Sequence, residues 1–343
     1  MSEDRPGEDL PGLDLSALSG WFTEHIGRPD GALTAEHIAG GKSNLTYRLR
    51  AGDGEWILRR PPVGRLLATA HDMGREYTVM SALAGTGVPV PQMYGLCTDE
   101  TVLGAPFYVM EAVEGTPYRR AAELSALGPQ RTRTISERLI DTLAALHAVD
   151  PAEVGLSGFG RPEGFLGRQV SRWRAQFEAA HTRDLPDMEA LHAALAAAVP
   201  ADGPPGIVHG DFRLDNVLFD DADRPAAVID WELSTLGDPL TDLALLGVYD
   251  RMGQASAGAV SDVAAAPGYL SGPGAVARYA ASSDRDLSDF GFYIGLACFK
   301  LAGIVEGIHY RYVNGQTVGD GFATLGEAVH PLLSAGLDAL NQN

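Results

Sequence analysis

The sequence predicts an α+β fold of two lobes, with a β-rich N-terminal lobe and an α-rich C-terminal lobe. Between residues 33 and 62 the apolar residues follow short strand-like runs, whereas helical spacing dominates beyond a linker near residue 115. The chain has 343 residues, which at about 150 residues per domain is enough for two cores. We therefore predict a disordered acidic arm at 1–12, an N-lobe at 13–113 and a C-lobe at 114–343.

The expected elements of the N-lobe follow from period and turn residues. Asp53-Gly54 predicts a hairpin turn between two strands, and Pro61-Pro62 ends the second of them. The elements are, in order, a helix at 13–27, strands at 33–41 and 44–62, a helix at 68–83 and a buried strand at 106–113.

The C-lobe is expected to be mostly helical, with its clearest helix at 135–147. Strand-like runs at 206–209 and 226–230 interrupt the helices, and the Gly/Ala-rich stretch 253–274 predicts a loop. The apolar stretch 290–305 contains Lys300 and is shorter than a bilayer span, so it predicts a core helix with Lys300 extending outward. The alternative is that Lys300 and Arg311 bind an anionic acceptor. Trp173 lies on a basic helix, where it either packs in the core or lines an acceptor pocket.

Charge and cysteine content exclude several classes of protein. The 26 basic and 45 acidic residues give a net charge of −19, which argues against binding to a nucleic acid backbone. An acidic N-terminus has the wrong sign for a signal peptide, and Cys97 and Cys298 are too few for a disulfide framework. We expect a cytoplasmic protein that does not bind a membrane, and the sequence carries no signal for its oligomeric state.

The chemistry is concentrated in the segment His209-Gly210-Asp211-Phe212-Arg213-Leu214-Asp215-Asn216. Asp230 follows Asn216 by fourteen residues, at the end of the next strand-like run. Magnesium prefers oxygen ligands and keeps waters and phosphates in the rest of its shell, so one or two carboxylates suffice. A further acid is left to accept the proton of a hydroxyl. The pattern predicts a site for phosphoryl transfer.

This segment, with Ile229-Asp230-Trp231, resembles the signature of the aminoglycoside phosphotransferase and choline kinase-like family. Further segments lie in family order: GGKSNLTYRL, WILRRPP, REYTVMSAL, FYVMEAVEG and GDPLTDLA. Within the family, the resemblance is nearest to the kinase-like domains that are fused to acyl-CoA dehydrogenases or occur as free-standing bacterial proteins. It covers about residues 30–310 and implies a bilobal protein-kinase-like fold.

The resemblance assigns roles in the second half of the chain. It implies that Asp211 is the catalytic base and that Asn216 and Asp230 hold Mg²⁺. Asp242 would pin the catalytic loop through its backbone, and His209 would orient that loop.

The resemblance also implies an ATP site in the first half of the chain. The phosphates would be covered by a loop comprising Gly40, Gly41, Lys42, Ser43 and Asn44. The adenine ring would be recognised by the backbone of a hinge comprising Glu111, Ala112 and Val113. Glu76 would form an ion pair with a basic residue of the third strand.

One departure from the family pattern concerns that basic residue, because arginine stands where the pattern has lysine. Strand alternation leaves one of Arg59 and Arg60 facing the nucleotide, and we favour Arg59. An arginine is bulkier than a lysine and forked, so the exchange is not neutral. Lys42, one of only two lysines, is a candidate to share the neutralisation of the phosphates.

The predicted activity is a small-molecule kinase that transfers the γ-phosphoryl of ATP to a hydroxyl of a small-molecule acceptor. The resemblance favours a hydroxy acid or hydroxyacyl thioester over an aminoglycoside, and it leaves ATP against GTP open. Two other hypotheses remain: a nucleotide-binding pseudokinase, which the arginine at the lysine position motivates, and a metal phosphoesterase, for which a second metal cluster is missing.

Overall fold

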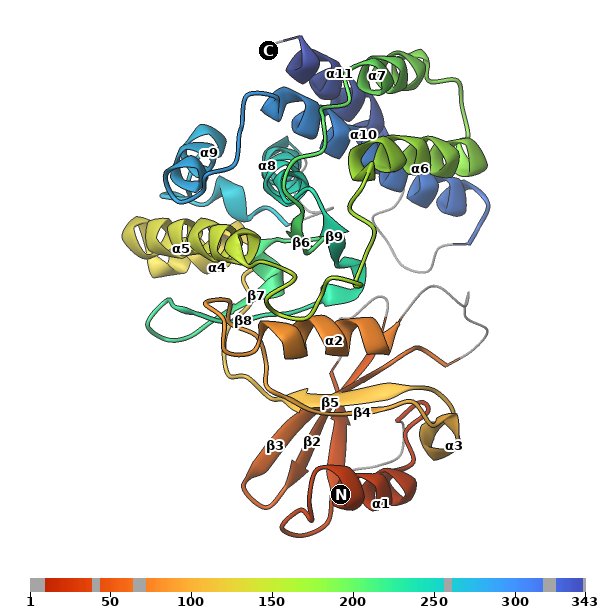
Figure 1. Cartoon of the computed structure of the whole chain (residues 1–343), viewed down its shortest axis with the longest axis vertical. Coiled ribbons are helices and arrows are strands. Elements are labelled where there is room, and N and C mark those ends of the chain that lie inside the picture. The colour runs from red at the N-terminus through yellow and green to blue at the C-terminus, as the bar shows by residue number, and fades with distance from the viewer. Residues whose placement is uncertain (1–9, 39–43, 64–71, 256–260, 317–324, 342–343) are drawn as a thin grey trace, which may run out of the picture. The chain divides into compact units, whose positions relative to one another are not determined.

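The computed structural model describes residues 10–38, 44–63, 72–255, 261–316 and 325–341 (Figure 1). The chain forms two compact units, one of residues 1–115 with 226–234 and one of residues 116–225 with 235–343. The first unit is built on a sheet and the second is mostly helical, so the predicted α+β class is confirmed.

The first unit contains a five-stranded antiparallel sheet of order β1-β2-β3-β5-β4. Its strands are β1 (Thr34–His37), β2 (Leu45–Ala51), β3 (Gly54–Arg60), β4 (Met93–Cys97) and β5 (Phe107–Glu111). Three helices accompany them: α1 (Leu15–His25), α2 (Met73–Leu83) and α3 (Glu100–Leu103).

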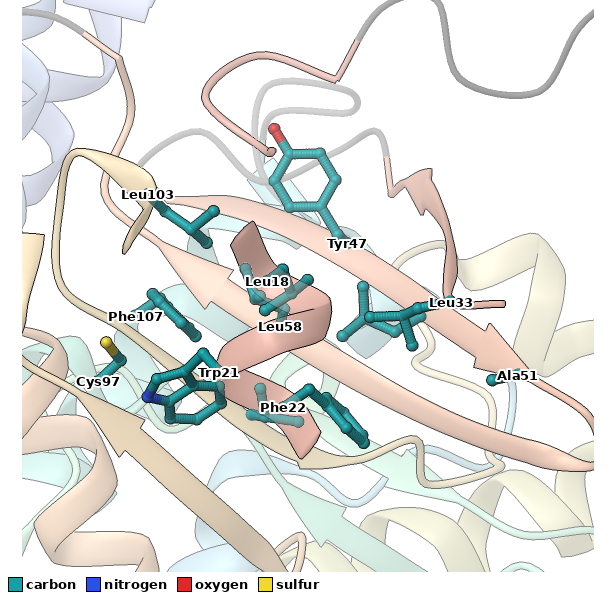
Figure 2. Close-up of a cluster of buried hydrophobic side chains, with 12 residues drawn as sticks. Leu18, Trp21, Phe22, Leu33, Tyr47, Ala51, Leu58, Cys97, Leu103 and Phe107 are labelled. Carbon is teal, nitrogen blue, oxygen red and sulfur yellow. The ribbon is translucent and has the colours of Figure 1, made fainter. Parts of the chain in front are cut away.

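One face of this sheet packs against α1. Figure 2 shows Leu18, Trp21 and Phe22 of α1 against Leu58 of β3 and Phe107 of β5, and all five side chains are buried. Successive residues of a strand point to opposite faces, so the residue after Leu58 and the residue after Phe107 face away from α1. That other face therefore carries Arg59 and Tyr108, which contact Glu76 of α2.

The hairpin between β2 and β3 differs from the prediction by one residue. Its two-residue turn is Gly52-Asp53, and Gly54 is already paired with Ala51 in the sheet. Gly52 has φ +56°, and a positive φ at the first turn position matches the right-handed twist of the strands. The prediction of a turn at Asp53-Gly54 did not take Gly52 into account.

Two further differences concern segment boundaries. Of the arm predicted at 1–12, residues 1–9 lie outside the described residues, but Pro11 accepts a hydrogen bond of 2.6 Å from the Tyr47 hydroxyl, so the ordered chain begins earlier than expected. The segment 226–234, which we predicted in the C-lobe, belongs to the first unit. The Val228 N–H donates to the Pro89 carbonyl over 2.8 Å, which ties it there.

The second unit is built from helices and short strands. Its helices are α4 (Ala121–Leu127), α5 (Pro129–Ala148), α6 (Phe165–Ala180), α7 (Pro186–Ala197), α8 (Leu240–Ala255), α9 (Gly272–Ala281), α10 (Phe290–Val313) and α11 (Val329–Leu340). Short 3₁₀ turns are η1 (Leu214–Asn216), η2 (Trp231–Leu233, in the first unit), η3 (Val263–Ala265) and η4 (Leu325–Ala328). The remaining strands are β6 (Gly206–Val208), β7 (Val217–Phe219), β8 (Pro225–Val228, whose last three residues belong to the first unit) and β9 (Thr235–Gly237), and β6 pairs with β9.

The long helix α10 is the centre of the second unit and packs against α6, α8 and α11. It has 24 residues, so the expectation that this stretch is too short for a bilayer is wrong. By length and composition α10 passes the test for a membrane-spanning helix, and 72% of its most apolar window is buried within the protein. Such burial is typical of a core helix.

A half-buried carboxyl of the same unit generates a prediction about stability. The Tyr269 hydroxyl donates to Asp250 of α8 over 3.4 Å, and burial raises the pKa of Asp250 to about 7. Between pH 4 and 7 the folded chain then binds a proton that the unfolded chain releases, so stability is lost as the pH rises through this window. Asp250→Asn should exceed the wild type in free energy of unfolding at pH 8, by about 1 kcal/mol or more. It should match the wild type at pH 4.

Denaturant unfolding at the two pH values measures this difference. Asp284→Asn, at an exposed position, is the matched control and should show no pH-dependent gain. An Asp250→Asn protein that is less stable than the wild type at pH 8 would contradict the prediction.

Candidate active site

The predicted catalytic loop, residues 209–216, follows strand β6 in the second unit. Asp242, in the first turn of α8, accepts the backbone N–H groups of His209 over 2.6 Å and Gly210 over 2.8 Å. Burial alone would raise the pKa of Asp242, but His147, His209 and the Gly210 N–H outweigh it and lower the pKa. Gly210 has φ +87°, a conformation that glycine adopts without strain. The prediction that Asp242 pins this loop is confirmed.

Asp211 and Asn216 lie side by side within this loop. The Asn216 amide nitrogen donates to the Asp211 carbonyl over 2.9 Å and to the Asp211 carboxylate over 3.3 Å. The Asp211 N–H donates to Nδ1 of the buried His209 over 3.2 Å, as expected of a histidine that orients the loop. The Asp211 side chain keeps 24% of its surface exposed. A fixed carboxylate that solvent can still reach is suited to accept a proton from a bound molecule.

Three residues around Asp211 were missed by sequence reasoning. The Arg213 guanidinium lies over the Tyr249 ring at 4.7 Å and donates to the Asp215 carboxylate over 2.8 Å. Burial raises the pKa of Tyr249, and its hydrogen bond to Asp211 adds to this effect. Arg213 and Asp215 lie within the segment 209–216, so their place in the sequence could have identified them as site residues. Tyr249 lies on α8 with no pattern to mark it.

The first unit holds the basic residue of the third strand. Arg59 is nearly buried, with Nη1 3.3 Å from the Glu76 carboxylate and Nη2 2.9 Å from the Asp230 carboxylate. Burial lowers the pKa of Arg59, but the acidic groups around it raise the pKa more. The predicted ion pair with Glu76 is therefore present, and Arg59 makes it. Arg60 points to the other face, where it donates to the Leu103 carbonyl over 2.9 Å.

Glu76 is fully buried and connects α2 to the sheet. It accepts from the Tyr108 hydroxyl over 2.8 Å and from the Asn44 amide over 3.1 Å. Burial raises the pKa of Glu76 to about 7, although Arg59 opposes the shift. The Asn44 amide also donates to Glu232 over 3.4 Å. The structure thus directs the Asn44 side chain to carboxylates, whereas the sequence grouped it with the phosphate-covering residues.

Asp230 has φ +68°, which is rare for a residue other than glycine but tolerated by aspartate and asparagine. The following Trp231 is buried and donates its indole N–H to the Val228 carbonyl over 3.0 Å. This turn fixes the backbone at Asp230. One carboxylate oxygen bonds Arg59, which leaves the second for another partner.

The remaining predicted nucleotide residues are placed only in part. Gly40, Gly41, Lys42 and Ser43 lie outside the described residues. Glu111 ends β5 and is held by Gln92, whose carbonyl accepts the Glu111 N–H over 2.8 Å. Ala112 and Val113 follow outside any regular element and are half-buried. Their role as a hinge stays a prediction.

The two predicted magnesium ligands each carry an oxygen donor. Because the Asn216 amide nitrogen is used by Asp211, its oxygen is the atom it can offer, and Asp230 offers a carboxylate oxygen. Both are hard donors of the kind Mg²⁺ prefers. Asn216 belongs to the second unit and Asp230 to the first, and the structure defines the position of each within its own unit. The described part of the chain contains no cluster of three His, Cys, Asp or Glu residues that would hold a metal unaided.

Comparison with known proteins identifies the family. The phosphotransferase enzyme family (APH) matches residues 34–279, which is most of the chain. The chain belongs to this family. A solved structure from Ralstonia eutropha JMP134, provisionally assigned as an aminoglycoside phosphotransferase, is 33% identical, with a TM-score of 0.83 over 96% of this chain and 98% of that one. The fold is therefore the protein-kinase-like phosphotransferase fold, as the resemblance implied.

Curated relatives point to one branch of the family. Acyl-CoA dehydrogenase family member 11 is 37% identical in Gallus gallus, over 91% of this chain and 41% of that protein. The human protein of the same name is 34% identical, over 95% of this chain and 43% of its own length. The chain thus spans less than half of these relatives. Family and relatives together support a kinase-type phosphotransferase acting on a small molecule.

The buried Arg59–Glu76 pair generates a prediction about stability. Removing Arg59 alone leaves the buried Glu76 carboxylate without its cation, whereas removing both leaves no buried charge at this contact. In a double-mutant cycle with Arg59→Met and Glu76→Gln, we expect the double variant to be more stable than the sum of the single effects. The coupling should be at least about 1 kcal/mol, measured by denaturant unfolding.

The exposed pair Arg50–Glu55, on the same sheet, is the matched control. Its coupling should stay below about 1 kcal/mol, because solvent screens surface ion pairs. Equal coupling in the two cycles would show that burial adds nothing to the Arg59–Glu76 pair.

Proposed function

We propose that the chain is an ATP-dependent kinase that phosphorylates a hydroxyl of a small acid, either a free hydroxy acid or its coenzyme A thioester. The observation that carries the proposal is the state of Asp211. This carboxylate is fixed by Asn216 and by the pinned loop, yet it stays accessible to a bound molecule.

In the proposed reaction Asp211 accepts the proton of the acceptor hydroxyl as that oxygen attacks the γ-phosphorus of ATP. The bond between the γ-phosphorus and the β–γ bridging oxygen breaks, and ADP leaves with the electron pair. Asn216 holds the Asp211 carboxylate in position, so little reorganisation is needed before attack. Arg213 lies 3.7 Å from the Asp211 carboxylate, so a positive charge stands beside the proposed base.

The nucleotide side of the proposal rests on Arg59. Its guanidinium is held by Glu76 and Asp230, and it has a further buried N–H at Nε with no hydrogen-bond acceptor among the described residues. A fixed guanidinium of this kind is suited to contact phosphate oxygens. We propose Asn216 and Asp230 as magnesium ligands. When bound, Mg²⁺ supplies positive charge that neutralises the phosphates.

The class of acceptor is supported by the relatives. By their names, the relatives in Gallus gallus and human belong to the acyl-CoA dehydrogenases, and this chain matches a part of them. A kinase joined to such an enzyme fits an acceptor that is an acid or its thioester. A further relative, a homoserine kinase of Methylobacterium nodulans, is 28% identical over 225 residues, and by its name it phosphorylates a hydroxylated acid.

ATP is supported as the nucleotide by more distant structures of the same fold. Aminoglycoside phosphotransferase APH(4)-Ia was crystallised with ADP and hygromycin B, and it shares 13% identity with a TM-score of 0.59. At this low identity the aminoglycoside acceptor is not carried over to this chain.

Asp211→Asn tests the assignment of the base. The amide keeps the size of the side chain but cannot accept the proton, so kcat should fall by about 10²-fold or more. ATP affinity should stay within about twofold of the wild type, because the change leaves the nucleotide contacts in place. ADP release with a panel of hydroxy acids and their thioesters measures turnover, and calorimetry measures ATP binding.

Normal turnover by Asp211→Asn would overturn the assignment. If the wild type binds ATP and phosphorylates no member of the panel, the result favours the non-catalytic nucleotide-binding module instead.

A further inference from the structure

Lys300 lies beside the catalytic loop, contrary to the expectation that it extends outward from α10. Its ammonium donates to the Gly210 carbonyl over 2.9 Å, one residue before Asp211. The contact joins the central helix of the second unit to the proposed catalytic base. The other lysine of the chain, Lys42, is outside the described residues.

The charge of Lys300 has no carboxylate partner within the described residues. Its ammonium has three N–H donors, of which Gly210 takes one. Burial lowers the pKa of Lys300, while Asp211 and Asp242 act on it from a distance in the opposite sense. None of the ion pairs among the described residues includes it, although the chain carries a large excess of acidic groups.

A second cation, Arg172, contacts the same aromatic ring as Lys300. The Lys300 ammonium and the Arg172 guanidinium of α6 are each 5.6 Å from the centroid of the Trp173 ring. Arg172 is exposed and helps to lower the pKa of Lys300, as expected of two like charges close together. Trp173 itself is buried between α6 and α10. Lys300 is half-buried and Arg172 is exposed, and both cations contact the Trp173 ring.

We propose that Lys300, assisted by Arg172, binds an anionic group of the phosphoryl acceptor. The group is a carboxylate if the acceptor is a free hydroxy acid, or a phosphate if it is a coenzyme A thioester. The Gly210 carbonyl fixes the ammonium next to Asp211, so one acceptor can place its anion on Lys300 and its hydroxyl on Asp211. The inference rests on the proposed function, and it adds a residue that selects charged over neutral acceptors.

The test compares charged and neutral acceptors in Lys300→Met. We use 4-hydroxybutanoate, its coenzyme A thioester and the neutral 1,4-butanediol as acceptors, with saturating ATP. A lost charge-assisted contact should raise KM for the charged acceptor by about 10-fold or more. The kcat/KM for the diol should stay within about twofold. Lys300→Arg, which keeps the charge, should retain the preference for the charged acceptor.

Two further variants make the test robust. Arg172→Met changes an exposed residue and is therefore expected to fold, and it should raise KM for the charged acceptor several-fold. Arg311→Met, at an exposed position in the last turn of α10, is the matched control and should change neither acceptor. A rise in KM for 4-hydroxybutanoate indicates that the bound anion is a carboxylate. A rise in KM for its coenzyme A thioester indicates that the bound anion is a phosphate.

Equal loss of kcat/KM for charged and neutral acceptors in Lys300→Met would overturn the inference, because it would show that Lys300 only positions the loop. An unchanged KM would also overturn it. Equilibrium binding of 4-hydroxybutanoate and of its thioester without ATP separates this from the proposed function. Binding that Lys300→Met weakens, in a protein that transfers no phosphate, would support the anion site and contradict the kinase.

Discussion

A buried guanidinium determines much of the first unit. Arg59 stands on a central strand of the sheet, where water cannot compensate its charge, and a buried charge is costly unless carboxylates pair with it. Glu76 and Asp230 provide that compensation from α2 and from the segment after β8. The need to pair one charge therefore positions a helix and a distant segment of chain against the same sheet face.

The second unit uses a buried charge of the opposite sign. Asp242 is buried and accepts two backbone N–H groups of the catalytic loop, and His147 lies 3.5 Å from it. Two N–H groups on one carboxylate fix the loop more firmly than a single contact, because the peptide plane between them cannot rotate. Asp211 and Asn216 are thus oriented by a residue that has no part in the chemistry itself.

Much of this arrangement could be predicted from the sequence, because the motif residues occur at fixed spacing along the chain. Asp211, Asn216 and Asp242 lie in or near one signature, and strand alternation was enough to favour Arg59 over Arg60. The predictions failed where long-range packing decides. Nothing local indicates that Lys300 turns back to the Gly210 carbonyl or that Tyr249 reaches Asp211, since both depend on how α8 and α10 pack. The segment 226–234 was also assigned to the wrong unit, because its contacts are distant in sequence.

The central claim is that the cluster of Arg59, Glu76 and Asp230 forms part of a magnesium-dependent ATP site. The most direct measurement is calorimetric titration of ATP with and without Mg²⁺ on the wild type and Asp230→Asn. Asparagine tolerates the positive φ of Asp230, so this variant removes charge without adding backbone strain. Asp223→Asn, at the other described non-glycine position with a positive φ, is the matched control. We predict that Mg²⁺ strengthens ATP binding in the wild type and in Asp223→Asn, and that Asp230→Asn loses this gain. Equal magnesium-dependent affinity in all three proteins, or no binding of ATP by the wild type, would contradict the account.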